Sequence, residues 1–211
     1  MTRSTHMKTR LMAAVAAAVA MFAGTLYART ALYTEKVDGL TWHYQIENGK
    51  ATIHNGTEPA AHYYDGSDPV GVVTIPSKLG GKSVAVIGDN AFSGCDDITS
   101  VTIPATVTTI GAAAFNGCDG LTSVKIPDSV TIIGEAAFSG CDSLKCVDFG
   151  KKVAYIAPYA FSDCELLRSL VFRGNEPTTV GDYAFDGVAE ECSVYVAKNA
   201  KWSVGGFSSW Q

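Results

Sequence analysis

The chain has 211 residues, 47% of them hydrophobic, which is enough to bury the core of one domain. Its 16 basic and 21 acidic residues give a net charge of −5, and no clustered basic segment is visible, which argues against a nucleic-acid-binding protein. The sequence also lacks a nucleophile-elbow, zinc-protease or phosphate-loop motif, so we expect no enzyme activity and no cofactor.

Residues 1–28 have the features of a secretory signal peptide. Arg3, Lys8 and Arg10 precede the apolar run LMAAVAAAVAMFAG, and the small residues after it predict cleavage behind Ala28. The run is shorter than the roughly 20 apolar residues of a membrane-spanning helix, and no second run follows. Without this segment the net charge falls to −8. We therefore expect a secreted or cell-surface protein whose mature chain has no membrane span.

Residues 29–70 are predicted to form an N-terminal β-hairpin cap. The segment TWHYQIENGKATIH contains Asn48-Gly49, a dipeptide that favours a two-residue hairpin turn. Such a turn creates an apolar face that can cover the first unit of the following array. The opposed pairs on this face are Tyr44 with Ile53 and Ile46 with Ala51.

His43 and His54 face each other on the other side of the same hairpin, with His62 near in sequence. Three imidazoles could in principle ligate a metal, but no carboxylate or thiol completes the set. We interpret these histidines as a solvated cross-strand pair and expect no metal site.

From residue 71 to residue 196 the chain repeats itself with a period of 23 residues. One unit reads L-x-x-V-x-I-P-x-x-V-x-x-I-G-x-x-A-F-x-G-C, and four apolar registers stay in step. Repeats of this length stack as coils, each burying its apolar side against its neighbours. We therefore predict a repeat solenoid of about six coils. Its interior row of phenylalanines is Phe92, Phe115, Phe138, Phe161 and Phe185.

Each unit is predicted to contain one short strand and one helical turn. In TSVKI, Val124 and Ile126 alternate with Ser123 and Lys125, which is typical of a strand with one buried face. Pro127 lacks the donor that a strand ladder needs, so it ends the pairing. VTII follows as a second extended piece, and GEAAFSG favours a one-turn helix. We expect parallel strands along one face of the array, with the helical turns elsewhere.

The array is expected to end where Glu190 replaces the inward position of Leu167. Residues 197–211 then form a C-terminal cap or tail, and the sequence leaves open whether this end is complete.

The repeat unit resembles the BspA-like leucine-rich repeat. The segments that carry the resemblance are VTIPATVTTIGAAAFNGC, VKIPDSVTIIGEAAFSGC and VDFGKKVAYIAPYAFSDC. Phe149-Gly150 and Phe172-Arg173 depart from the Ile-Pro of the pattern, at corners and not in the core. The family is found in secreted and surface-exposed microbial proteins. The resemblance implies an interaction scaffold, since some members bind host extracellular-matrix proteins or other cells.

Four cysteines share one phase of the repeat, three residues after each phenylalanine. Adjacent coils lie about 4.8 Å apart, within the separation that a disulfide tolerates, and a secreted protein permits oxidation. The next coil has Val188 instead, which favours a packing role over one or two disulfides, and no C-x2-C pair indicates zinc. Cys146 and Cys192 stand outside this ladder, on strands. The ladder consists of Cys95, Cys118, Cys141 and Cys164.

The outward residues of the predicted strands are the candidate ligand-binding surface, because a stacked backbone presents them as a preorganised array. We expect a protein or glycan ligand and an adhesin function. The alternatives are a structural spacer of the cell envelope with a plain solvated face, and a hydrolase with an unrecognised site. One column is Ser100, Ser123, Cys146, Ser169 and Ser193, and the second is Thr102, Lys125, Asp148, Val171 and Tyr195.

Overall fold

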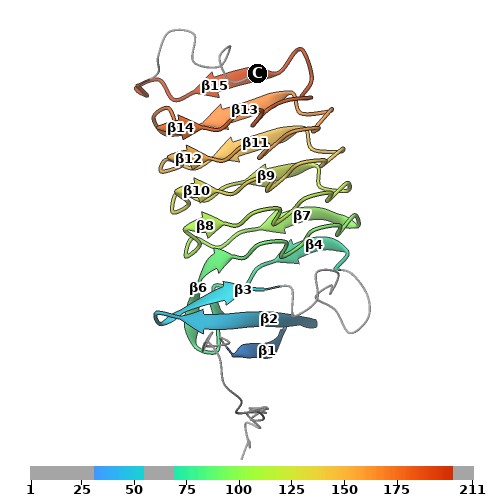
Figure 1. The fold of residues 1–211 in the computed structure, drawn as a ribbon, viewed down its shortest axis with the longest axis vertical. Helices are drawn as coiled ribbons and strands as arrows, with labels where there is room; N and C mark the ends of the chain where they lie inside the picture. Colours follow the sequence, from blue (N-terminus) through green and yellow to red (C-terminus); the bar gives the residue numbers. More distant parts are fainter. Residues whose placement is uncertain (1–30, 55–68, 202–211) are drawn as a thin grey trace, which may run out of the picture.

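The computed structural model describes residues 31–54 and 69–201, which form a β-solenoid of stacked coils (Figure 1). The predicted signal peptide lies outside the described residues, as do parts of the predicted cap and tail. Two sheets run along the stack. One has six strands in the order β15-β13-β11-β9-β7-β4, and the other has nine, in the order β1-β2-β3-β6-β8-β10-β12-β14 with β5 attached to β6.

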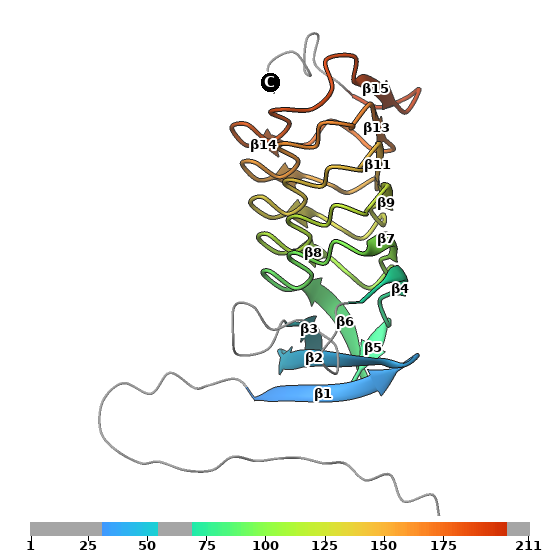
Figure 2. The ribbon, with the colours of Figure 1, turned by 90° about the vertical axis from the view of Figure 1, so that its right-hand side faces the viewer.

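The six-stranded sheet confirms the prediction of short parallel strands. Each coil contributes one strand, so residues one period apart become neighbours. Figure 2 shows this sheet along the right-hand side of the stack. Its strands are β4 (Gly71–Thr74), β7 (Ile98–Thr102), β9 (Ser123–Lys125), β11 (Cys146–Phe149), β13 (Ser169–Phe172) and β15 (Ser193–Val196).

The second extended piece of each unit pairs into a parallel sheet of its own. Sequence analysis expected the extended piece but not the sheet, because two residues per coil are too few to show an alternating pattern. Inward Ile110, Ile133 and Ile156 are fully buried and stand in register across successive coils. The two-residue strands are β8 (Thr109–Ile110), β10 (Ile132–Ile133), β12 (Tyr155–Ile156) and β14 (Thr179–Val180).

The predicted one-turn helices are not confirmed, since no helix occurs within residues 31–54 and 69–201. Residues 112–117 form turns in which Ala113 has a φ of 51°. The amide of Phe115 donates to the carbonyl of Ala137 in the next coil at 2.7 Å, and the amide of Gly117 donates to that of Ser139 at 2.9 Å. Helix formation would turn these amides back along their own segment, so bonding between coils wins over local propensity.

At the N-terminal end, β1 (Leu32–Val37), β2 (Leu40–Glu47) and β3 (Lys50–Ile53) form an antiparallel unit. The β2–β3 turn produces the expected pairs, with Tyr44 opposite Ile53 and Ile46 opposite Ala51. β3 then pairs in parallel with β6 (Lys82–Ile87), which also receives β5 (Lys78–Leu79). β1 was not predicted. The role of this unit as a cap, like the domain boundaries, stays a prediction.

The interior contains the predicted row of phenylalanines. Ring centroids of Phe92, Phe115, Phe138 and Phe161 follow one another at 5.0, 5.1 and 5.1 Å, with ring planes within 8° of parallel. Phe185 continues the row at 5.4 Å. All five rings are buried. Close stacking of this kind adds about 0.5–1.5 kcal/mol per aromatic pair beyond the apolar area removed from water.

Candidate functional site: the strand face

We call the outward side chains of the six-stranded sheet the strand face. Cys146 is in register with Ser123 and Ser169, while Asp148 is in register with Lys125 and Val171. Ser193 and Tyr195 extend the same two columns. Val101 is in register with Val124, so Ser100 and Thr102, on either side of Val101, align with Ser123 and Lys125. The structure therefore brings all ten predicted residues together in the two expected columns. Their role in binding a ligand is not tested by this placement.

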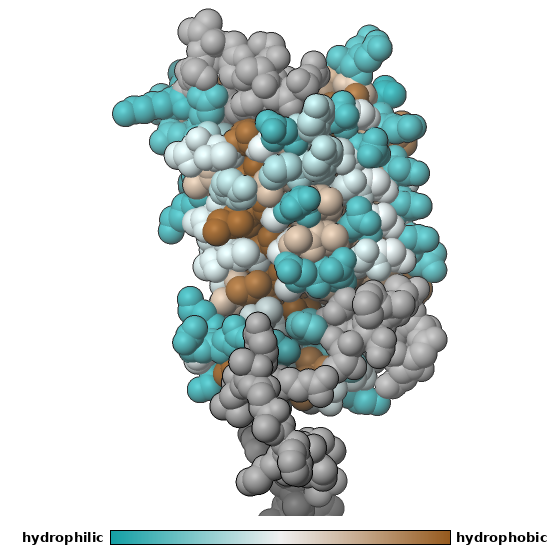
Figure 3. Space-filling model, in the orientation of Figure 1, coloured by the Kyte–Doolittle hydropathy of each residue, from teal (hydrophilic) through white to brown (hydrophobic). Residues whose placement is uncertain are grey.

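Alternate burial separates the strand face from the core. Val124, Val147 and Leu170 are buried, whereas Ser123 and Lys125 are exposed. At the C-terminal end, the side chain of Tyr195 is 58% exposed. Figure 3 shows the stack from the side away from the six-stranded sheet, where hydrophobic side chains form small separate patches among hydrophilic and neutral ones.

β4 adds two residues that sequence analysis did not include in the face. Val72 is in register with Ser100, and Thr74 is in register with Thr102. Both are exposed, Val72 at 70%. The alternation in VVTIP indicated a strand with Val72 and Thr74 outward. The extra residues around Gly80-Gly81 interrupt the 23-residue period, so this strand was not aligned with the others.

A third outward column was missed as well. The amide of Lys145 donates to the carbonyl of Thr122 at 2.9 Å, and the amide of Arg168 donates to that of Lys145 at 3.1 Å. These residues are exposed and lie one above another, with Thr99 below them. Strict alternation allows one outward residue between inward positions, whereas the L-x-x-V spacing of the repeat leaves two. The L-x-x-V spacing could therefore have predicted the third outward column.

Asp148 is not a free carboxylate. The Arg173 guanidinium, from the residue after β13, donates from Nε to Asp148 Oδ1 at 2.6 Å and from Nη2 to Oδ2. This two-point hydrogen bond raises the pKa of Arg173 above its ordinary value. Arg173 stands where the repeat usually has proline, so this departure from the pattern introduces a cation that reaches back to the strand face.

The four ladder cysteines are buried and unlinked. The thiols of Cys118 and Cys141 donate to the carbonyls of Phe92 and Phe115, at 3.1 and 3.2 Å respectively. Burial raises the pKa of the Cys118 thiol well above its usual range. Thiols in this state are poor nucleophiles and poor metal ligands, which agrees with the packing interpretation.

Cys192 takes a different place from the one expected. It lies one residue before β15, not on it. Its amide donates to the carbonyl of Ala189, three residues earlier, and in the preceding coil the amide of Leu167 donates to the carbonyl of Cys164 in the same way. It packs half-buried against the core, whereas Glu190 is exposed. Cys192 thus fills the inward position that we had assigned to Glu190. Burial, followed by the nearness of Cys146, raises the pKa of its thiol.

The histidine pair is more buried than a solvated pair would be. The amide of His54 donates to the carbonyl of His43 at 3.0 Å, and the Nδ1 atoms of both rings are shielded from water. Burial lowers the pKa of His43, and His54 lowers it further. Within the described part of the chain, no three His, Cys, Asp or Glu side chains are placed to hold a metal ion.

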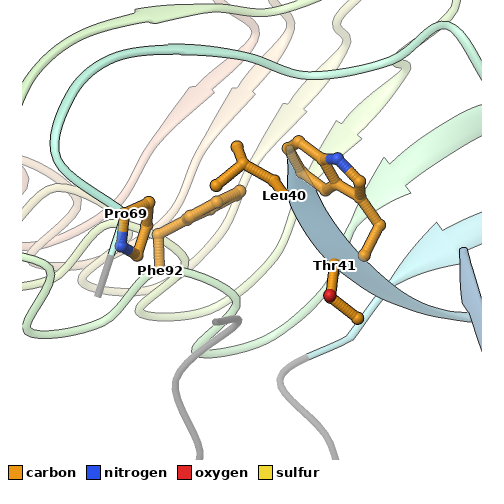
Figure 4. A pocket seen from close by; sticks show the side chains of 5 residues that line it. Leu40, Thr41, Pro69 and Phe92 are labelled. Atoms are coloured by element: carbon orange, nitrogen blue, oxygen red, sulfur yellow. The ribbon is translucent and has the colours of Figure 1, made fainter. Parts of the chain in front are cut away.

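The described residues form no deep ligand pocket. A small cavity of about 10 Å³ lies between the N-terminal unit and the first coils, where Leu40, Pro69 and Phe92 surround it (Figure 4). An open hollow of about 290 Å³ lies beside Phe185 and Glu190. The first is smaller than any substrate site, and neither contains a nucleophile with an adjacent base.

A stack of like coils that presents a regular outer face defines a solenoid repeat protein. Residues 85–202 match the model of the BspA type leucine-rich repeat region in six copies. The chain belongs to this family, as its sequence indicated. In the described residues, no helix has the length and apolar character needed to cross a membrane.

Two of the solved structures that are similar to the chain illustrate the fold. The leucine-rich repeat protein TpLRR of T. pallidum is 28% identical with a TM-score of 0.60, and the match covers 69% of this chain and 64% of that one. The pneumococcal vaccine antigen PcpA is 20% identical with a TM-score of 0.57, over 82% and 53% of the two chains. The chain thus spans less than two thirds of the length of either relative. No curated protein matches it.

Proposed function

We propose that the protein is a secreted or surface-displayed binding module, an adhesin, that engages a protein or glycan through the strand face. The observation that carries this proposal is the register of the six-stranded sheet, which lines up outward residues from successive coils. The predicted signal peptide supports a location outside the cell.

A flat face suits a large partner better than a small substrate. Small molecules need a concave site that covers most of their surface, whereas the hollow beside Phe185 and Glu190 is open and the cavity beside Phe92 holds only about 10 Å³. Side chains on hydrogen-bonded strands need little further ordering when a partner docks, which lowers the entropic cost of association.

Capture from a panel tests the proposal. The panel contains extracellular-matrix proteins together with neutral and acidic glycans. Ser123→Trp places a bulky ring at the centre of the strand face, and Thr179→Trp places the same ring on exposed β14 of the other sheet. We expect at least one panel member to bind the wild type and Thr179→Trp but not Ser123→Trp. Equal capture by both variants, or no capture by the wild type, would contradict the proposal and favour a spacer.

A further inference from the structure

Charge is segregated around the solenoid. We call the segments that lead from the second sheet back to the six-stranded sheet the turn edge. They contain twelve acidic residues and no basic one. The segments that follow them, 98–110, 122–133, 145–156, 168–180 and 193–201, contain eight basic and three acidic residues. The turn edge consists of residues 88–97, 111–121, 134–144, 157–167 and 181–192.

Three of these basic residues gather on and directly beside one part of the strand face, although they are far apart in sequence. Lys145 and Arg168 lie on adjacent coils in the third column, with backbones hydrogen-bonded at 3.1 Å. Lys125 lies on the next coil, in register with Asp148. Sequence analysis found no clustered basic segment because each of these three coils contributes one cation to the cluster. The fold assembles the cluster that the linear sequence hides.

The neighbouring carboxylates do not neutralise this cluster. Asp148 is bound by Arg173, and Asp128 is bound by Lys151 at 3.5 Å. No carboxylate of the described residues lies within ion-pair distance of Lys125, Lys145 or Arg168. Lys125, together with Lys145, Arg168 and Arg173 directly beside β11 and β13, therefore outweighs Asp148 and leaves an excess of positive charge here, on a chain that is acidic as a whole.

Given the proposed function, on which this inference rests, we infer that the ligand of the strand face is a sulfated polysaccharide that lies across β9, β11 and β13. Charge complementarity carries the inference, because a polyanion is attracted to the strand face and repelled by the acidic turn edge. The docked chain is thereby oriented onto one side of the solenoid.

The chemistry between the cations favours a sulfated sugar chain over other polyanions. Ser123 and Ser169 are small hydroxyl donors in the columns beside Lys145 and Arg168, so a ring can approach the sheet closely. A sulfate ester has three acceptor oxygens, which can accept from a cation and a neighbouring hydroxyl together. Single-stranded nucleic acid would need aromatic platforms for its bases, and β9, β11 and β13 present none on their outward positions.

The test uses three polymers with one backbone: dextran, carboxymethyl dextran and dextran sulfate. Binding to the purified wild type is measured by surface plasmon resonance, next to single-stranded DNA and polyglutamate. Lys145→Gln with Arg168→Gln removes two cations from the strand face. Lys78→Gln with Lys82→Gln, on β5 and β6, makes the same change in net charge elsewhere. Thermal melting verifies that both double variants are folded.

We expect dextran sulfate to bind the wild type, dextran not to bind, and carboxymethyl dextran to bind more weakly. The strand-face double variant should lose about tenfold in affinity, and the matched variant should change by less than about twofold. Raising the salt from about 0.05 to about 0.5 M should weaken the binding strongly. Equal losses in both double variants would mean attraction by net charge alone and would overturn the inference.

Other outcomes separate this inference from the proposed function. Tighter binding of DNA, polyglutamate or carboxymethyl dextran than of dextran sulfate would overturn the ligand class. Capture of a protein or neutral glycan that is lost in Ser123→Trp, without any binding of dextran sulfate, would leave the proposed function standing and refute the sulfated ligand. Absence of every interaction would refute both.

Discussion

The ring of Phe138 has like neighbours on both sides, at 5.1 Å from Phe115 and from Phe161. Removing it leaves a cavity that the fixed coil spacing cannot close. We expect Phe138→Ala to reduce the free energy of unfolding by about 3–5 kcal/mol, as measured by urea denaturation.

Cys141→Val is the matched control for this prediction. Cys141 is buried beside the same row, and the next-but-one coil carries Val188 at the equivalent position. The substitution loses one weak hydrogen bond to Phe115 and should cost at most about 1 kcal/mol. A larger loss for Cys141→Val than for Phe138→Ala would show that the cysteines, and not the rings, hold the interior together.

His43 predicts a dependence of stability on pH. Its pKa is lowered in the folded state by burial and by His54, so the unfolded chain takes up a proton more readily than the folded one. The stabilisation is complete above the ordinary histidine pKa near 6.5 and is lost as the pH falls below it. The melting temperature should therefore drop between pH 7.5 and pH 5.5, and His43→Gln should reduce this drop. An unchanged drop in the variant would place its cause elsewhere.

At the scale of the element, close approach of the coils explains a column of glycines. A Cβ built on Gly134 would meet the backbone carbon of Gly111 at 2.5 Å, so the adjacent turns leave no room for a methyl group. Gly134→Ala should cost about 3 kcal/mol in unfolding free energy, because backbone must move.

Gly140→Ala separates this clash from backbone strain. A Cβ on Gly140 would lie at an ordinary contact distance of 3.9 Å from the backbone of Gly117, but the residue has a φ of 69°, so the substitution costs only the strain of a left-handed backbone, about 1 kcal/mol. Urea denaturation of both variants gives the comparison. Equal losses would mean that the contact between turns does not limit the side chain at position 134.

The turns also show where prediction from sequence reached its limit. The spacing of Phe115 and Phe138 predicted the interior row, and the alternation in TSVKI predicted the strand face. The alanines beside Phe138 favoured a helix on local propensity, but the amides of these turns bond to the next coil. Contacts of this kind exist only after stacking, so no single unit contains the signal. For the same reason, the sequence did not predict that Lys145 and Arg168 lie next to each other on one surface.

At the scale of the whole molecule, each coil contacts mainly its two neighbours, and equivalent positions hold equivalent residues. Deleting residues 116–138 removes one full period and joins Phe115 to Ser139 in phase. We expect this variant to fold with one strand fewer in each sheet and with Phe115 stacked on Phe161. Far-ultraviolet circular dichroism and limited proteolysis check this outcome.

Deleting residues 116–126 is the control, because it shortens the chain by about half a period and puts inward residues outside. This variant should be unfolded. If it folded as well as the full-period deletion, the stacking of like residues would not be what determines the structure.

The hydrogen bonds that join one turn to the next run along the stack and not across it. A stack that is held at one end and pulled at the other would therefore load these bonds in series, and the weakest junction between coils would open first. A chain pulled sideways at one coil, by contrast, would share the load between two junctions. The direction of the pull, as much as its strength, then decides which force the stack withstands.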